Sequence, residues 1–188
     1  TGYQNPGVIH LPQGAGLTLT SRNIQGNSSL LSVSPPGIHK DALVGDTILM
    51  DDGNLSLNVL DIQGDDVICR VDVGGRLTER RGVTTPGKAP ALPFLDERAK
   101  SVLKFAVDVE ADFIALSNVN SAEDIKMARG ILNELGPDSY IVSKIERAEA
   151  LENFVSILDA SDGIMVARGD MGVEVPLAHV PVIQKKLI

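Results

Sequence analysis

The sequence contains little of several residue types, and each shortage excludes a class of protein. It has one cysteine, Cys69, so no disulfide can form within the chain. Its three histidines are scattered and lack the spacing of a zinc site. Tryptophan is absent and aromatic residues make up 3% of the chain, too few to build stacking platforms for nucleic-acid bases. A chain with one cysteine and no disulfide framework is typical of the cytoplasm.

Positive charge and long apolar runs are also scarce. The chain has 17 basic and 25 acidic residues, a net charge of −8, whereas a nucleic-acid-binding protein needs a basic face. No stretch approaches the roughly 20 apolar residues of a membrane span. We therefore predict neither a nucleic-acid nor a membrane partner. The chain begins Thr-Gly-Tyr, without an initiator methionine or a signal peptide, so we expect it to be a segment of a longer cytoplasmic protein.

Residues 1–86 have the pattern of β-strands. Hydrophobic residues make up 43% of the chain, enough for folded cores, and here they alternate with polar ones over 48–59 and 67–73. Asp-Gly at 52–53, between two alternating runs, is typical of a hairpin turn. We predict an all-β domain over 1–86, a small antiparallel barrel or sandwich, with Cys69 in its core.

From about residue 86 the pattern changes to alternating helices and strands. A stiff segment rich in Pro and Gly, 86–93, marks the predicted domain boundary. Helical spacing follows over 95–106, with Asp96 as the predicted N-cap, and Ser121 to Asp124 resembles a capping box. Three strands are predicted at 112–119, 140–146 and 163–169, with helices between them. One of these helices is predicted over 151–158 from its stripe of apolar residues. Repeated βα units predict a parallel sheet or a (β/α)8 barrel over 87–188.

Polar residues stand at the carboxyl end of each predicted strand, where active sites of parallel α/β folds lie. Lys144 and Glu146 are two residues apart, so they point to one face of their strand. Asp170, after the neighbouring strand, can approach Glu146. Two converging carboxylates predict a Mg²⁺ (or Mn²⁺) site that in turn holds an anionic substrate. Lys144 would then stabilise negative charge that develops in the transition state.

Structural interpretations of the same residues stay open. Lys144 and Glu146 could form a salt bridge at a barrel rim, and Asp170 could cap the following turn. The tripeptide 168–170, Arg-Gly-Asp, could be an adhesion motif, but adhesive loops are exposed and this one ends a predicted buried strand. Gly169 allows a ligand to approach the backbone closely, and the amides around it could bind a carboxylate or a phosphate.

Long blocks of the sequence resemble the pyruvate kinase family. They are "GDTILMDDGNLSLNV", "RRGVTTPGKAPALP", "ADFIALSNVNSAEDI", "SKIERAEALENF" and "GIMVARGDMGVEVP", in the same order as in the family. The resemblance implies a β-barrel lid domain, 1–86, inserted into a (β/α)8 barrel of which 87–188 is a part. It implies transfer of phosphate from phosphoenolpyruvate to ADP, giving pyruvate and ATP, with Mg²⁺ and K⁺ as cofactors. It also implies a homotetramer for the full-length enzyme.

The resemblance assigns roles residue by residue. Lys144 matches the family lysine that stabilises the enolate and contacts the substrate. Glu146 and Asp170 match the protein ligands of Mg²⁺. A substrate-binding segment matches Ala167, Arg168, Gly169 and Asp170. Arg81 falls where the family has a nucleotide-contacting lysine, a change that keeps the charge and alters the geometry.

Several features depart from the family. Asn118 and Asn120 replace Phe and Arg, and Arg147 replaces an asparagine. The arginine that contacts substrate phosphate, the K⁺ ligands and the remaining barrel strands lie outside this sequence. We therefore expect little activity from the segment alone. Two other functions stay open: a non-catalytic fragment or association module, and another barrel enzyme that uses phosphoenolpyruvate or pyruvate. The β-rich half argues against the second of these.

The incomplete barrel leads to an expectation about folding. Three strands cannot close a barrel of eight, and their outer edges would be exposed to pairing with other chains. We therefore expect 1–86 to fold as an independent domain and 87–188 to be less stable alone.

Overall fold

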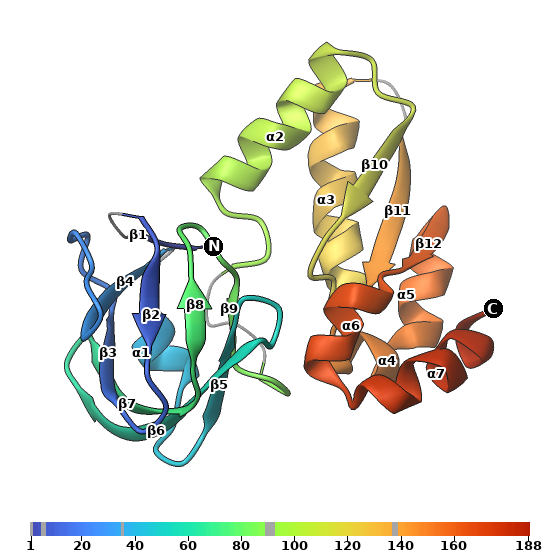
Figure 1. Cartoon of the computed structure of the whole chain (residues 1–188). Helices are drawn as coiled ribbons and strands as arrows, with labels where there is room; N and C mark the ends of the chain where they lie inside the picture. Colours follow the sequence, from blue (N-terminus) through green and yellow to red (C-terminus); the bar gives the residue numbers. More distant parts are fainter. Residues whose placement is uncertain (1, 5–6, 35, 89–92, 137–138) are drawn as a thin grey trace. The chain divides into compact units, whose positions relative to one another are not determined.

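A computed structural model of the chain describes residues 2–4, 7–34, 36–88, 93–136 and 139–188. The chain divides into two compact units, Thr1–Ala91 and Leu92–Ile188, which we describe separately (Figure 1). In the described ranges no helix is long and apolar enough to cross a membrane.

The first unit is built around a seven-stranded sheet that curls over its own core (Figure 1). The strand order is β1-β4-β3-β7-β6-β5-β9. These strands are β1 (Gly2–Gln4), β3 (Gly16–Thr20), β4 (Leu30–Ser34), β5 (Thr47–Met50), β6 (Leu55–Gln63), β7 (Asp66–Val73) and β9 (Val83–Thr84). A separate antiparallel pair is formed by β2 (Ile9–Leu11) and β8 (Gly75–Leu77), and a short helix α1 spans Ile38–Asp41.

The sheet differs from the purely antiparallel one that we predicted. Strands β3 and β4 pair in parallel, with Leu19 opposite Leu31. The other pairs in this sheet, as described, are antiparallel. Alternation of apolar and polar residues reports which face of a strand is buried and carries no information on strand direction. The pattern therefore identifies strands without specifying how they pair.

The predicted hairpin is confirmed between β5 and β6. Met50 pairs with Leu55 at its base. Asp51, Asp52 and Gly53 all have positive φ, at 51°, 56° and 84°. Aspartate and glycine tolerate this left-handed backbone better than other residues, so the turn follows from its composition.

The core of the first unit lies under the alternating runs. Buried side chains come from every second position of the strands and include Ile48, Met50, Leu55, Leu57, Val59, Val67, Cys69 and Val71. Burial raises the pKa of the Cys69 thiol to about 12, because the thiolate would lose its hydration there. Cys69 is therefore a core thiol, as predicted, and it stays protonated at neutral pH.

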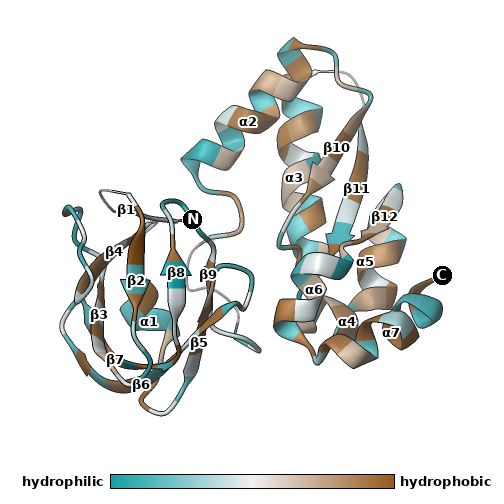
Figure 2. Cartoon of the chain, in the orientation of Figure 1, coloured by the Kyte–Doolittle hydropathy of each residue, from teal (hydrophilic) through white to brown (hydrophobic). Residues whose placement is uncertain are grey.

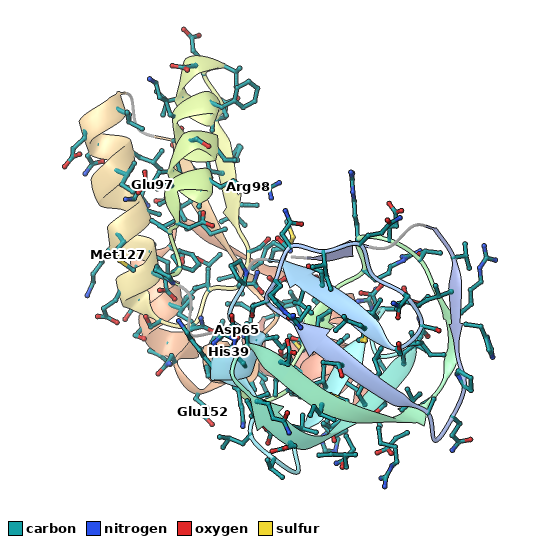
Figure 3. All side chains as sticks on the ribbon, turned by 90° about the vertical axis from the view of Figure 1, so that its left-hand side faces the viewer. His39, Asp65, Glu97, Arg98, Met127 and Glu152 are labelled. Carbon is teal, nitrogen blue, oxygen red and sulfur yellow. The ribbon has the colours of Figure 1, made fainter. Side chains whose placement is uncertain are left out.

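A polar network joins α1 to the strands of the first unit. Ser21 Oγ lies 3.0 Å from His39 Nδ1 and accepts a hydrogen bond from the Gly37 amide. On the other side of the ring, His39 Nε2 lies 3.6 Å from Asp65 Oδ1 (Figure 3). His39 thus has a packing role in holding α1, and within the described ranges it belongs to no group of three or more metal-ligating side chains.

The second unit contains three parallel strands with helices between them. Its strand order is β10-β11-β12, and Leu116 pairs with Ser143 and Ile145 with Val166. The elements are α2 (Glu97–Asp108), β10 (Phe113–Leu116), α3 (Ala122–Leu135), β11 (Tyr140–Ile145), α4 (Ala148–Glu152), α5 (Phe154–Ala160), β12 (Gly163–Val166), α6 (Arg168–Glu174), a 3₁₀ turn (Leu177–His179) and α7 (Val180–Leu187).

The predicted ends of two helices are confirmed. Asp96 accepts a hydrogen bond of 2.7 Å from the Ala99 amide at the start of α2. Ser121 and Asp124 form a capping box at the start of α3, and Gly136 ends that helix. These side chains satisfy backbone groups that have no partner within the helix itself.

Three elements differ from their predictions. The strand predicted over 112–119 ends at Leu116. The helix predicted over 151–158 is broken at Asn153 into α4 and α5, so Val155 is 71% exposed and Ile157 is buried instead. The strand predicted over 163–169 ends at Val166. After Val166 the Ala167 amide still donates to Ile145 O at 3.2 Å, but Ala167 O accepts from the Met171 amide and opens α6.

One face of this sheet is covered and the other is open. Residues such as Ile114, Ile141 and Ile145 pack into the core with α3 and α5. On the opposite face, Phe113 and Tyr140 are exposed and their rings stack with centroids 5.3 Å apart. Within the described ranges, β10 and β12 each have a strand partner on one side alone. Figure 2 shows that the strands are mainly apolar and that a hydrophilic stretch lies near the carboxyl end of β11.

An ion pair ties α3 to the amino ends of the strands. Asp162 Oδ2 accepts hydrogen bonds from the Arg129 guanidinium and, at 2.7 Å, from the Ile141 amide. Arg129 Nη1 also donates to Ser139 O at 3.1 Å. The hydrogen bond from Arg129, followed by that from Ile141, holds the pKa of Asp162 below its ordinary value of 3.8, although desolvation opposes the shift.

This pair predicts how stability depends on pH. Because the folded-state pKa of Asp162 is depressed, its stabilising contribution is present above pH 3.8 and is lost as pH falls through the lower folded-state pKa. Asp162→Asn should lower the free energy of unfolding by about 1 kcal/mol at pH 7, since the pair is partly exposed to solvent. Urea unfolding at pH 7 and pH 3 measures this. A difference that stays undiminished at pH 3 would contradict the prediction.

Candidate active site

The ammonium group of Lys144 lies at the centre of a polar cluster at the carboxyl end of the sheet. Lys144 Nζ is 2.8 Å from Glu146 Oε2 and 3.8 Å from Asp170 Oδ2. It also donates a hydrogen bond of 2.9 Å to Ser117 Oγ, which follows β10. Residues that follow or end all three strands therefore converge on one nitrogen atom. The distance between Glu146 Oε2 and Asp170 Oδ2 therefore cannot exceed the sum of their distances to Lys144 Nζ.

Glu146 is the buried member of the cluster, with a side chain that is 5% exposed. Its Oε1 accepts a hydrogen bond of 2.6 Å from the Asn118 amide. Its Oε2 accepts no hydrogen bond of normal geometry from the described residues, although Lys144 Nζ lies close by. We interpret the Lys144 contact as an ion pair with poor hydrogen-bond angles. Glu146 Oε2 is thus a buried carboxylate oxygen that has an ammonium counter-ion beside it and accepts no hydrogen bond.

Asp170 is the exposed member, with a side chain that is 64% exposed. It lies in the first turn of α6 and does not cap that helix, because no side-chain cap is formed there. Asp170 and Glu146 both lie near the Lys144 ammonium, which is compatible with the prediction that Asp170 can approach Glu146. The Lys144–Glu146 salt bridge that we left open also exists, so the structural and the functional interpretations describe the same atoms.

The residues around Asp170 form the turn between β12 and α6. Ala167 is the residue before the helix, and Arg168 and Gly169 are its first two residues. Arg168 and Gly169 are exposed, and a Cβ atom on Gly169 would have no neighbour within 4 Å. Open space therefore lies beside the Gly169 backbone.

Arg81 belongs to the first unit. Its Nε lies 3.0 Å from Asp51 Oδ1 and donates to Thr78 Oγ1 at 2.8 Å. About half of the Arg81 side chain is exposed to solvent. Both contacts use Nε, at the base of the guanidinium fork.

The cluster suits a divalent cation with few protein ligands. Among the described residues, no group of three or more His, Cys, Asp or Glu side chains is arranged to hold a metal. Mg²⁺ needs fewer, because it is commonly bound by one or two carboxylates and keeps several waters or substrate oxygens. The Oε2 of Glu146, which accepts no hydrogen bond, and the exposed carboxylate of Asp170 fit this requirement.

Two features of the cluster were not expected from the sequence. Asn118 has a left-handed backbone, with φ of 57°, which directs its amide at Glu146. Asparagine adopts this conformation more readily than most residues, so the residue type is the one available signal. The second feature is a buried ion pair between Arg147 and Glu174, which nothing in their spacing indicates.

Comparison with known proteins relates this cluster to a family. The sequence profile described as pyruvate kinase, barrel domain, matches residues 1–188. The chain belongs to the pyruvate kinase family. The resemblance in its sequence blocks is therefore confirmed. The pyruvate kinase of Thermotoga maritima is 39% identical over 188 residues, covering 100% of this chain and 40% of that protein.

Other pyruvate kinases match at similar levels. The enzyme of Clostridium acetobutylicum is 41% identical over 190 residues, covering 100% of this chain and 40% of its own length. That of Mycobacterium tuberculosis is 36% identical over 182 residues, covering 97% of this chain and 39% of its own. The chain thus spans about two fifths of the length of these pyruvate kinases.

Proposed function

We propose that this chain contributes to an enzyme that transfers phosphate between phosphoenolpyruvate and ADP, giving pyruvate and ATP. The observation that carries this proposal is the convergence of Glu146 and Asp170 on Lys144 at the carboxyl end of a parallel sheet. Membership of the pyruvate kinase family supports the choice of reaction. It does not favour another phosphoenolpyruvate-using barrel enzyme.

In this proposal Glu146 and Asp170 hold Mg²⁺ or Mn²⁺. The bound cation neutralises and orients the anionic substrate. Asn118 keeps one oxygen of Glu146 occupied through its amide, so the other oxygen is presented to the cation. Lys144 then places its ammonium beside the substrate, where it stabilises negative charge that develops on the departing pyruvate group.

The remaining site residues have proposed roles of their own. The backbone from Ala167 to Asp170, with Arg168 and Gly169 between them, binds the substrate carboxylate, and open space beside Gly169 leaves room for it. Arg81 binds the nucleotide through the terminal nitrogens of its guanidinium, while Nε stays with Asp51 and Thr78.

The family also suggests the setting of these residues. We propose that 1–86 is the β-barrel lid and that 87–188 is part of a (β/α)8 barrel. The whole enzyme would be a cytoplasmic homotetramer that uses K⁺ as well. The segment alone would be poorly active, because losses within a concerted set of groups each cost orders of magnitude.

Metal-dependent substrate binding tests the proposed function. Phosphoenolpyruvate should bind the chain when Mn²⁺ is present and bind far more weakly without it, as followed by water-proton relaxation. Lys144→Met should weaken substrate binding and leave Mn²⁺ binding intact or stronger, since a competing positive charge is removed. Binding of phosphoenolpyruvate that is the same with and without Mn²⁺ would contradict the proposal.

Turnover addresses the activity of the segment itself. In a lactate dehydrogenase-coupled assay, pyruvate formation by this chain should be far slower than that of a complete pyruvate kinase. A rate near that of a complete enzyme would overturn this expectation. A chain that binds neither Mn²⁺ nor phosphoenolpyruvate would instead support a non-catalytic association module, and its mass in solution would then show whether it self-associates.

A further inference from the structure

We infer that Arg147 is a positioning residue, which holds α6 in the orientation that brings Asp170 toward Glu146. The inference rests on the proposed function in one respect, the role of Asp170 as a metal ligand. Arg147 directly follows Glu146 at the end of β11, at the position where the family has an asparagine. Its side chain connects the strand that carries one proposed ligand to the helix that carries the other.

Arg147 is a buried charge with acidic neighbours. Its side chain is 6% exposed, and Nη1 lies 3.3 Å from Glu174 Oε1, whose side chain is 5% exposed. Its Nε lies 3.6 Å from Glu149 Oε2 on α4. An arginine so far removed from water is stable only when its charge is compensated. The contact with Glu149 is too long for a hydrogen bond, so Glu174 is the nearer counter-ion.

Glu174 lies four residues after Asp170 on the same helix. Side chains that are four apart lie on the same side of an α-helix, about one turn from each other. A contact at Glu174 therefore fixes the direction in which Asp170 points. Within α6, Met171 is the one fully buried residue. A single apolar anchor resists lifting of a helix from its support but resists rotation about the helix axis weakly, and the ion pair supplies that second restraint.

The energetics of buried ion pairs make this inference testable. Removing one partner leaves an uncompensated buried charge, whereas replacing both by apolar side chains of similar size is often tolerated. Arg147→Met alone should thus release α6 from its position. Arg147→Met combined with Glu174→Leu should restore the packing of α6 without restoring any charge, because the remaining acidic neighbour, Glu149, lies on α4 and has a side chain that is 25% exposed.

The sign of the effect on metal binding separates positioning from simple electrostatics. If Arg147 acted on the site as a nearby positive charge alone, its removal would tighten Mn²⁺ binding. If it positions Asp170, its removal weakens binding. Residues in the layer outside the metal ligands typically change affinity by about 10- to 100-fold, and we expect about tenfold weaker binding for Arg147→Met.

The experiment uses the full chain and two measurements. Hydrogen exchange of two amides at the ends of α6 reports on the helix with no metal present: that of Met171, which donates to Ala167 O, and that of Val175, which donates to Met171 O. Mn²⁺ titration reports on the proposed site. Arg129→Met is the matched control, because it breaks another arginine ion pair of the same unit, at the opposite end of the strands.

For Arg147→Met we expect faster exchange in α6, unchanged exchange in α3 and weaker Mn²⁺ binding. The double variant should recover slow exchange in α6 and Mn²⁺ binding. Arg129→Met should leave exchange in α6 unchanged. Unchanged α6 exchange in Arg147→Met, or tighter Mn²⁺ binding, would overturn the inference. Failure of the unaltered chain to bind Mn²⁺ would contradict the proposed function instead, and α6 exchange would then decide the role of Arg147 by itself.

Discussion

The Glu146→Gln variant should bind Mn²⁺ at least about 100-fold more weakly than the unaltered chain, beyond the range typical of residues outside the ligand layer. The substitution replaces a carboxylate oxygen by a neutral amide group while keeping the size of the side chain. The Gln amide oxygen can still accept the hydrogen bond that the Asn118 amide donates to Glu146 Oε1. The fold around the site should therefore persist, and the loss should come from the ligand itself.

Glu152→Gln is the control for this experiment. Glu152 belongs to α4 in the same unit, is exposed to solvent and points away from the ribbon (Figure 3). Its substitution makes the same change in net charge and should leave Mn²⁺ affinity nearly unchanged, because the charge is screened by water and salt. Electron paramagnetic resonance of free Mn²⁺ measures both affinities. Equal weakening in the two variants would show that the effect is a general one of net charge.

Gly74→Ala should lower the free energy of unfolding of the first unit by about 3 kcal/mol, the upper part of the range for overpacked sites. A Cβ atom on Gly74 would lie 2.3 Å from Leu11 O and 2.8 Å from Gln13 N. Both are backbone atoms, so no side chain can rotate away to make room. The strand β2 would have to move, and its pairing with β8, where Leu11 lies opposite Gly75, would be disturbed.

Gly82→Ala provides the comparison within the same unit. A Cβ atom there would meet no other atom within 4 Å, so the change should alter stability by about 0.5 kcal/mol or less. Urea unfolding measures the free energy, and amide exchange in residues 9–11 and 75–77 locates the damage. Similar stability losses in both variants would rule out the close backbone contact as the cause.

Local chemistry explains which parts of the fold the sequence predicts well. The hairpin at Asp51–Gly53 and the caps at Asp96 and Ser121 depend on residues next to each other in the chain. Their side chains or backbone preferences act within one turn, so no distant part of the molecule can override them easily.

Tertiary contacts explain what the sequence did not predict. The strand before Arg168 ends early because the Ala167 carbonyl accepts a hydrogen bond from the Met171 amide and so begins a helix. The sequence does not predict a helix there, because glycine has a low helix propensity. The parallel pairing of β3 with β4 likewise cannot be predicted from the alternation of apolar and polar residues. In the candidate site, Lys144, Glu146 and Asp170 could be chosen from strand ends alone, whereas Arg147 and Glu174 meet only once α6 is in place.

Lys144 also has a consequence for how a metal would enter this site. Without a metal, its ammonium already serves as the counter-ion of Glu146 and lies near Asp170. A divalent cation held by these two carboxylates would therefore have to take the place of a tethered monovalent ion. The four-carbon side chain would keep the displaced ammonium at the sheet edge, where its charge would be available to an anion.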